Sequence, residues 1–89
     1  MSNTTTTVTP SDIAILEASY MSATVSTRSG SHYTVITRPS VGVVLINETR
    51  GLVARGTTLR IIDGRMYLLT NGQVIASTTR LTQVYILEN

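Results

Sequence analysis

The chain has 89 residues, of which 42% are apolar, and this length suits one small domain with a thin core. The absence of cysteine excludes disulfides and thiolate metal sites as reinforcement, so we expect a homo-oligomer. The formal net charge of +2 is too small to indicate nucleic-acid binding by itself.

The segment 1–8 is rich in Ser, Thr and Asn and has no apolar period. It predicts a disordered tail, which leaves 9–89 as the single domain. The segment has neither the basic start nor the apolar stretch of a signal peptide, and no apolar run approaches the roughly 20 residues that span a bilayer. We therefore expect a cytoplasmic protein with no membrane partner.

A helix is predicted from Pro10 to about Ser22. Thr9 is a capping residue, Pro10 suits the first helical position, and Asp12 follows the cap by three residues. The helical period gathers an apolar stripe that also contains Glu17: Leu16, Tyr20, Ile13, Glu17 and Met21. Either the Glu17 carboxylate reaches solvent or an arginine of the sheet, or it faces a pocket.

From Ala23 onward the sequence changes to short β-branched runs separated by turn residues, which is typical of antiparallel strands. The predicted strands are 23–28, 32–38, 41–47, 52–55, 57–62, 65–70, 73–78 and 81–87. The predicted fold class is mainly β, with one N-terminal helix packed on a small antiparallel sheet or SH3-like barrel and a C-terminal β-meander.

The meander is predicted by two dipeptides, Asp63-Gly64 and Asn71-Gly72, each flanked by β-forming runs. Both dipeptides suit two-residue hairpin turns, which need positive φ at both central positions.

Tight turns fix a register in which Arg60 lies opposite Tyr67 and Tyr67 lies opposite Ala76. The core face of the meander is then formed by Leu59, Ile61, Met66, Leu68 and Ile75. The outer face carries Arg60, Arg65, Tyr67, Ile62, Leu69, Val74, Ala76, Thr58 and Thr78. This outer face is too apolar for ordinary surface, and we predict that the helix, a second sheet or another subunit covers Ile62, Leu69 and Val74.

Catalytic chemistry is poorly supplied, because the chain has one histidine, no cysteine, no lysine and five carboxylates. Three of the carboxylates already have a structural explanation: Asp12 belongs to the helix start, Asp63 to a tight turn and Glu88 to the last two residues. His32 is expected to be an exposed residue at a strand start, since neighbouring serines alone do not make a triad. Neither metal-ligand spacing nor a phosphate-binding glycine loop occurs, so we expect a non-enzyme with no catalytic residues, metal or cofactor.

All seven basic residues are arginines and all four aromatic residues are tyrosines. The predicted ligand-binding group is Arg60, Arg65 and Tyr67, extended by Arg80, because guanidinium groups hold phosphate and a phenol ring stacks on a base. The alternative is that these arginines cover apolar surface and pair with Glu17 or Glu48. A second set of arginines lies at strand ends or in turns: Arg28, Arg38, Arg50 and Arg55. These residues either are ordinary solvent-exposed surface or form one continuous basic stripe.

Two stretches, Val25–Val35 and Ile75–Leu81, carry a Thr-Arg, small-residue, Tyr, apolar pattern and a Thr/Ser-rich strand. In this the chain resembles small uncharacterised β-rich proteins of actinobacteria and their phages. The resemblance implies a phage or mobile-element setting and no known activity.

Two functions follow from the outer face of the meander. The first is a non-enzymatic binding module for an anionic ligand, a nucleotide or a nucleic acid. The alternative is an interaction or structural protein, either a host-protein inhibitor or a homo-oligomeric assembly component, docking through its apolar sheet face. Salt separates the two, because it weakens phosphate binding and leaves apolar contacts intact.

Overall fold

The computed structural model describes residues 8–89, and its single helix there, α1 (Pro10–Leu16), begins as the sequence predicts. The Thr9 hydroxyl accepts a hydrogen bond from the Asp12 N–H, and the Asp12 carboxylate accepts one from the Thr9 N–H, both at 3.1 Å. The helix is shorter than predicted, because Glu17 caps its end and Met21 already starts the first strand, fully buried. Strand pairing therefore outweighs the helical period in this segment. In the described part of the chain, no helix has the length and apolarity needed to cross a membrane.

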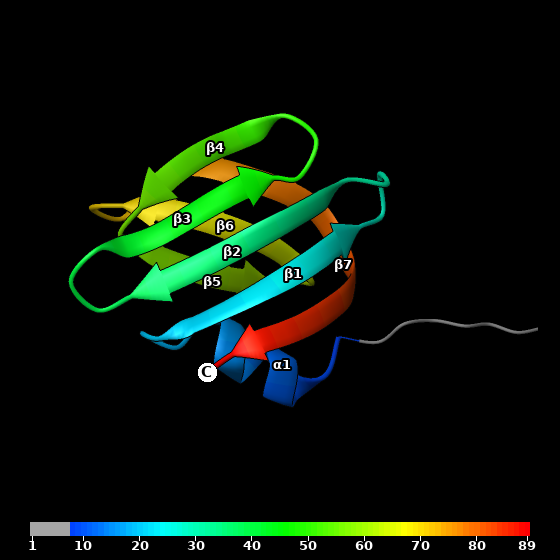
Figure 1. Ribbon diagram of the computed structural model, residues 1–89, viewed down its shortest axis with the longest axis horizontal. Coiled ribbons are helices and arrows are strands. Elements are labelled where there is room, and N and C mark those ends of the chain that lie inside the picture. Colours follow the sequence, from blue (N-terminus) through cyan, green and yellow to red (C-terminus); the bar gives the residue numbers. More distant parts are fainter. Residues whose placement is uncertain (1–7) are drawn as a thin grey trace, which may run out of the picture.

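Seven strands follow the helix: β1 (Met21–Thr27), β2 (His32–Arg38), β3 (Gly42–Asn47), β4 (Gly51–Gly56), β5 (Thr58–Ile62), β6 (Arg65–Thr70) and β7 (Gln73–Glu88). They form one antiparallel sheet in the order β4-β3-β2-β1-β7-β6-β5. The sheet curls into a half-barrel, with α1 packed beside β1 and β5 (Figure 1). The predicted class, a mainly β domain with an N-terminal helix on an antiparallel sheet and a C-terminal meander, is confirmed.

The last strand, β7, joins the two halves of the sheet. Its first half pairs with β6 and its second half with β1, so the predicted break between 78 and 81 is absent. The strand bends instead through pairing irregularities, at which an extra residue is inserted and the twist increases. The chain therefore passes from one half of the half-barrel to the other without a loop.

One of these irregularities changes the predicted register of the meander. The turn residues Asp63 and Asn71 have positive φ, as predicted for tight hairpins, and Arg60 lies opposite Tyr67. However, Tyr67 lies opposite Ser77 and not Ala76, because an extra residue enters β7 between the partners of Leu69 and Leu68.

The inserted residue is Ile75, and it reverses the alternation of the strand beyond it. Ile75 is consequently exposed rather than part of the core, whereas Ala76 packs against the core and Thr78 is buried. The predictions for these three side chains were wrong, because the turn fixes the register only up to the first bulge.

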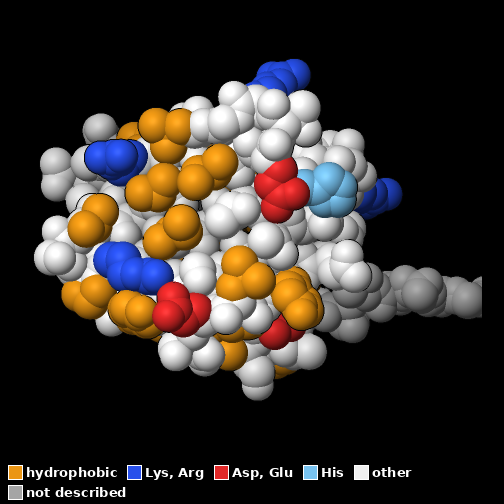
Figure 2. Space-filling model, viewed as in Figure 1, with side chains coloured by type: hydrophobic (Ala, Val, Ile, Leu, Met, Phe, Trp, Pro, Cys, Tyr) orange, Lys and Arg blue, Asp and Glu red, His pale blue; other side chains and the backbone are white. Residues whose placement is uncertain are grey.

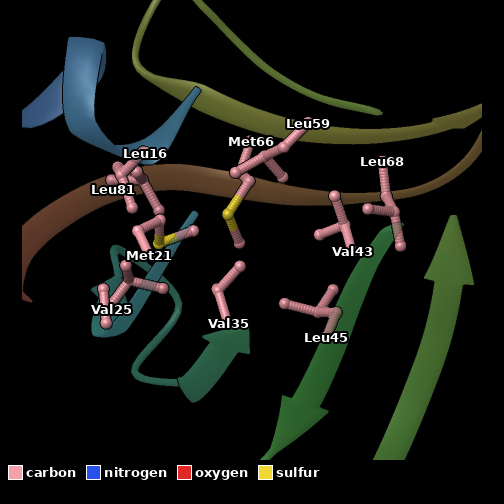
Figure 3. Close-up of a cluster of buried hydrophobic side chains, with 11 residues drawn as sticks. Leu16, Met21, Val25, Val35, Val43, Leu45, Leu59, Met66, Leu68 and Leu81 are labelled. Carbon is pink, nitrogen blue, oxygen red and sulfur yellow. The ribbon is translucent and has the colours of Figure 1, made fainter. Parts of the chain in front are cut away.

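The core lies between the two halves of the curled sheet and beneath α1 (Figure 3). Leu16, Met21 and Leu81 meet at the helix end of this core, and Val43, Leu45 and Leu68 meet at the opposite end. The full set is Leu16, Met21, Ala23, Val25, Val35, Val43, Leu45, Leu59, Met66, Leu68 and Leu81. Val8, which the sequence assigned to the tail, also packs against it, and the rest of that predicted tail, 1–7, lies outside the described residues.

The junction between β4 and β5 is held tightly against β6. The Thr57 N–H donates to the Leu69 carbonyl at 2.8 Å. A Cβ at Gly56 would lie 2.8 Å from that same oxygen, so this position has room only for glycine. The contact fixes where the chain enters the meander that carries the predicted site.

Candidate functional site

The predicted ligand-binding residues emerge together on the outer face of β5, β6 and the first half of β7. Arg60 lies opposite Tyr67 on the neighbouring strand, and Arg65 lies opposite Arg80. Antiparallel partners point to the same side of a sheet, and so do residues two apart on one strand, such as Arg60 and Ile62 or Arg65 and Tyr67. We call Arg60, Arg65, Tyr67 and Arg80 the Arg/Tyr face.

The arginines of this face are exposed, and Tyr67 is half-buried among them. Arg80 forms a long ion pair with Asp63 at 3.6 Å, and both side chains are at least half exposed. Within residues 8–89, no ion pair engages Arg60 or Arg65. Two guanidinium groups and the tyrosine ring are therefore available to a ligand.

The acidic partners predicted for these arginines are engaged elsewhere. Glu17 Oε2 accepts a hydrogen bond from the Ile61 N–H at 2.7 Å, and Glu48 Oε2 accepts one from the Thr34 hydroxyl at 3.4 Å. The alternative that these arginines pair with Glu17 or Glu48 was wrong for the described residues, because the two carboxylates bond to a backbone N–H of β5 and to a hydroxyl of β2.

Glu17 also lines a hollow of about 190 Å³, together with Thr37 and Arg38. Of the alternatives predicted for Glu17, pairing with an arginine is contradicted, because the exposed carboxylate bonds to the backbone of β5. Its position at the border of a hollow agrees with the other alternative, a carboxylate facing a pocket. Among residues 8–89, the buried Thr37 hydroxyl has no hydrogen-bond partner. The hollow lies at the end of the half-barrel beside α1 and is separate from the Arg/Tyr face.

The apolar residues predicted as an interface lie on the same face as the arginines. Ile62 is 60% exposed and Val74 is 56% exposed, while Leu69 is half-buried. Leu69 lies opposite Val74, and Ile62 lies opposite Arg65. The exposure of Ile62 and Val74 shows that neither α1 nor the other half of the sheet covers these two side chains, and another subunit as their cover stays a prediction.

The second set of arginines does not form the continuous stripe that was considered. Figure 2 shows the basic side chains of the β1–β4 side as separate spots near its rim. One of them, Arg38, is fully engaged: Nη1 donates to the carbonyls of Met21 and Thr37 at 3.1 and 2.9 Å, and Nη2 lies 3.0 Å from Glu88 Oε1. Its guanidinium carbon also lies 4.1 Å from the centroid of the Tyr20 ring.

A serine–histidine contact on the outer face of β1 and β2 escaped the sequence analysis. Ser26 Oγ lies 2.9 Å from His32 Nδ1, because the two residues are cross-strand partners. Within the described residues, no carboxylate is hydrogen-bonded to the imidazole, which a nucleophile–base pair requires for orientation. Nor do residues 8–89 contain a group of three or more potential metal ligands.

The chain matches no protein-family model, no curated protein and no solved structure. The resemblance to small β-rich proteins of actinobacteria and their phages therefore stays a prediction, and the proposals below depend on the geometry alone.

Proposed function

We propose that the protein is a non-enzymatic binding module for single-stranded nucleic acid and that the Arg/Tyr face is its binding surface. The observation that carries the proposal is the clustering of three exposed arginines around Tyr67 on neighbouring strands, with Arg60 and Arg65 free of ion pairs in the described chain. A flat sheet with aromatic and basic side chains is a recurrent platform for single strands.

The spacing of the face suits an extended polyanion. Neighbouring strands lie about 4.8 Å apart, and alternate residues along a strand lie about 7 Å apart. Guanidinium groups at these intervals hold successive phosphates, and each donates two parallel hydrogen bonds to phosphate oxygens through its planar fork. The ring of Tyr67 offers a stacking surface for a base, and Ile62 and Leu69 beside it offer apolar contacts for sugars.

A polymer fits this surface better than a free nucleotide does. Nucleotide sites are usually concave, whereas the described hollows beside Glu17, beside Tyr85 and beside His32 are not lined by the Arg/Tyr face. A flat exposed face gains its affinity by contacting several phosphates of one chain. We therefore favour nucleic acid over the nucleotide. The cytoplasmic location and the phage or mobile-element setting stay predictions from the sequence.

The test is fluorescence anisotropy with a labelled single-stranded oligonucleotide over a salt series. Three arginine–phosphate contacts predict a slope of about −2 in log K against log salt. Arg60→Ala with Arg65→Ala should weaken binding at least about tenfold and lower the slope. The matched control, Arg50→Ala with Arg55→Ala, removes the same charge from the β3–β4 side of the sheet and should change affinity much less. Equal losses in both pairs, or no binding by the wild type, would refute the proposal.

A second candidate is docking onto another protein, favoured by the exposure of Ile62 and Val74 on the same face. Apolar docking would hold as salt rises, whereas phosphate binding would weaken. Ile62→Ser with Val74→Ser separates the two, because it removes apolar area and leaves every arginine in place. Loss of a salt-resistant complex in this variant would support the second candidate.

A further inference from the structure

The Arg/Tyr face ends in a row of three arginines, where the β5–β6 turn meets the bend of β7. Arg65 is the first residue of β6 and lies opposite Arg80 on β7. On the other side of β7, the Arg28 N–H donates to the Arg80 carbonyl at 2.8 Å. Neighbouring strands lie about 4.8 Å apart, so the three residues follow one another across the sheet. We call Arg28, Arg80 and Arg65 the arginine row.

The three side chains of the arginine row lie on the outer side of the sheet. Each is exposed, and each is next in sequence to a buried residue: Thr27, Leu81 or Met66. Successive side chains of an extended chain point to opposite faces, so the arginines point away from the core that these neighbours enter. The row therefore continues the outer face that carries Tyr67.

The charges of the arginine row are left uncompensated by the fold. Arg65 and Arg80 are direct cross-strand partners, and like charges in this arrangement destabilise a sheet. Among the described residues, only Asp63 forms an ion pair with the row, at 3.6 Å from Arg80, and its side chain is 80% exposed. An anion bound between the guanidinium groups would replace this repulsion with attraction, so the row is better suited to a bound anion than to the free sheet.

The central arginine is held in position without a ligand. A Cβ at Gly64 would lie 3.1 Å from Arg80 Cγ, so the Arg80 side chain passes close over the Gly64 backbone. The Leu81 N–H donates to the Gly64 carbonyl at 2.7 Å and ties this turn to β7, while Asp63 contacts the guanidinium end. A side chain that is already placed loses less conformational entropy when a ligand binds.

The β1–β2 turn, which carries Arg28, is fastened to the bend of β7 by hydroxyl groups. Ser29 Oγ lies 3.0 Å from Thr27 Oγ1 and 3.2 Å from Thr79 Oγ1. The Ser29 N–H also donates to Thr79 Oγ1 at 3.4 Å. These contacts keep Arg28 beside Arg80, so Arg28 belongs with the Arg/Tyr face although its strand lies in the other half of the sheet.

We infer that the arginine row binds a terminal phosphate group, so that the module recognises a phosphorylated end of a nucleic-acid strand. This inference rests on the proposed function. A phosphate monoester carries a charge of about −1.5 to −2 at neutral pH, whereas a phosphodiester within the strand carries a single negative charge. Three guanidinium groups, one of them shared with Asp63, match the higher charge of the monoester.

The position of the arginine row also suits the end of a strand. The row lies beside the turn at Asp63 and Gly64, where the Arg/Tyr face stops. Arg65 is two residues from Tyr67, which corresponds to about 7 Å along β6. A terminal phosphate held in the row thus leaves the first base within reach of the Tyr67 ring, and the strand continues toward Arg60.

The first test compares three oligonucleotides of one sequence that carry a 5′-phosphate, a 3′-phosphate or neither, each labelled at an internal base. Anisotropy should show at least about fivefold tighter binding for one of the two phosphorylated ends. Arg28→Gln should reduce this ratio of dissociation constants to less than about twofold. The matched control, Arg50→Gln, removes the same charge from the turn between β3 and β4 and should keep the ratio. Circular dichroism checks that both variants keep the fold.

The outcomes of this comparison separate the inference from the proposed function. Equal binding of all three oligonucleotides, or a preference that Arg28→Gln leaves intact, would overturn the inference and leave the proposed function standing. Failure of all three to bind would overturn the proposed function and the inference together.

The second test uses inorganic phosphate, which probes the arginine row without a nucleic acid. In NMR spectra of the arginine side-chain N–H groups, phosphate added at constant ionic strength should shift the signals of Arg28, Arg65 and Arg80. The signals of Arg50 and Arg55 should stay in place. Single substitutions assign the signals, since the chain has seven arginines and no lysine. Equal shifts at all arginines, or none in the row, would overturn the inference.

Discussion

Arginine has two different roles on the two halves of the half-barrel. On the β1–β4 half, Arg38 binds two backbone carbonyls, Glu88 and the Tyr20 ring, and it ties the ends of three segments together. On the β5–β7 half, Arg60 and Arg65 project from the sheet without an ion pair among the described residues. The residue type is the same, so the neighbours that the register supplies decide whether an arginine stabilises the fold or remains available to a ligand.

The difference between the two halves is tested most severely by reversing the charge of Arg60 and Arg65. Arg60→Glu with Arg65→Glu should lower the affinity for a single-stranded oligonucleotide by about 100-fold, because repulsion replaces two phosphate contacts. The free energy of unfolding should change by less than about 0.5 kcal/mol, since both side chains are exposed. Anisotropy and urea unfolding measure the two quantities. A large loss of stability would show that these arginines also support the fold.

The converse change is Arg38→Ala on the β1–β4 half, where the arginine is bound to neighbouring groups. It removes two hydrogen bonds to carbonyls and a half-exposed ion pair, so we expect a destabilisation of about 2 kcal/mol. For a domain of this size that corresponds to a fall in Tm of roughly 10 °C. Oligonucleotide affinity, measured at a temperature where the variant is folded, should be unchanged. A stable Arg38→Ala variant with weakened binding would reverse the assignment of roles.

Replacing the aromatic ring of the Arg/Tyr face should have a smaller effect. Tyr67→Leu keeps an apolar side chain on β6 but removes the stacking surface, and it should weaken binding about tenfold, within the range measured for one base stacked on an aromatic ring. The salt slope should stay the same, because no arginine is lost. A changed slope with unchanged affinity would exclude stacking on Tyr67.

The smallest expected effect concerns Arg80, the one member of the face with an ion pair. Asp63→Asn removes that exposed partner and keeps a residue type that tolerates positive φ. Stability should change by less than about 0.5 kcal/mol, and oligonucleotide affinity should rise about twofold. If affinity falls, Asp63 contributes to the ligand site instead of competing with it.

Local signals in the sequence predicted much of this molecule. The helix start at Thr9 and the two hairpin turns depend on residues close together in the chain, and the structure confirms both. The register predicted from these turns placed Arg60 opposite Tyr67 and the candidate site on one face, and the structure has the same pairing of Arg60 with Tyr67.

What the sequence did not predict depends on residues far apart in the chain. The bulge at Ile75 reflects how β7 must bend to reach β1, and no nearby residue signals it. Likewise, Glu17 meets Ile61 and Arg38 meets Glu88 across separations of 44 and 50 residues. The position of β4 as a terminal strand was equally hidden, since strand order depends on the whole topology.

The 16-residue strand β7 also has a consequence for the order of folding. It is the last strand of the domain, yet it supplies the pairing partner for both β1 and β6, and Leu81 fills the core between them. During synthesis, the hairpins of each half emerge before the strand that joins them. The two halves can therefore join into one sheet only after this last strand has been synthesised.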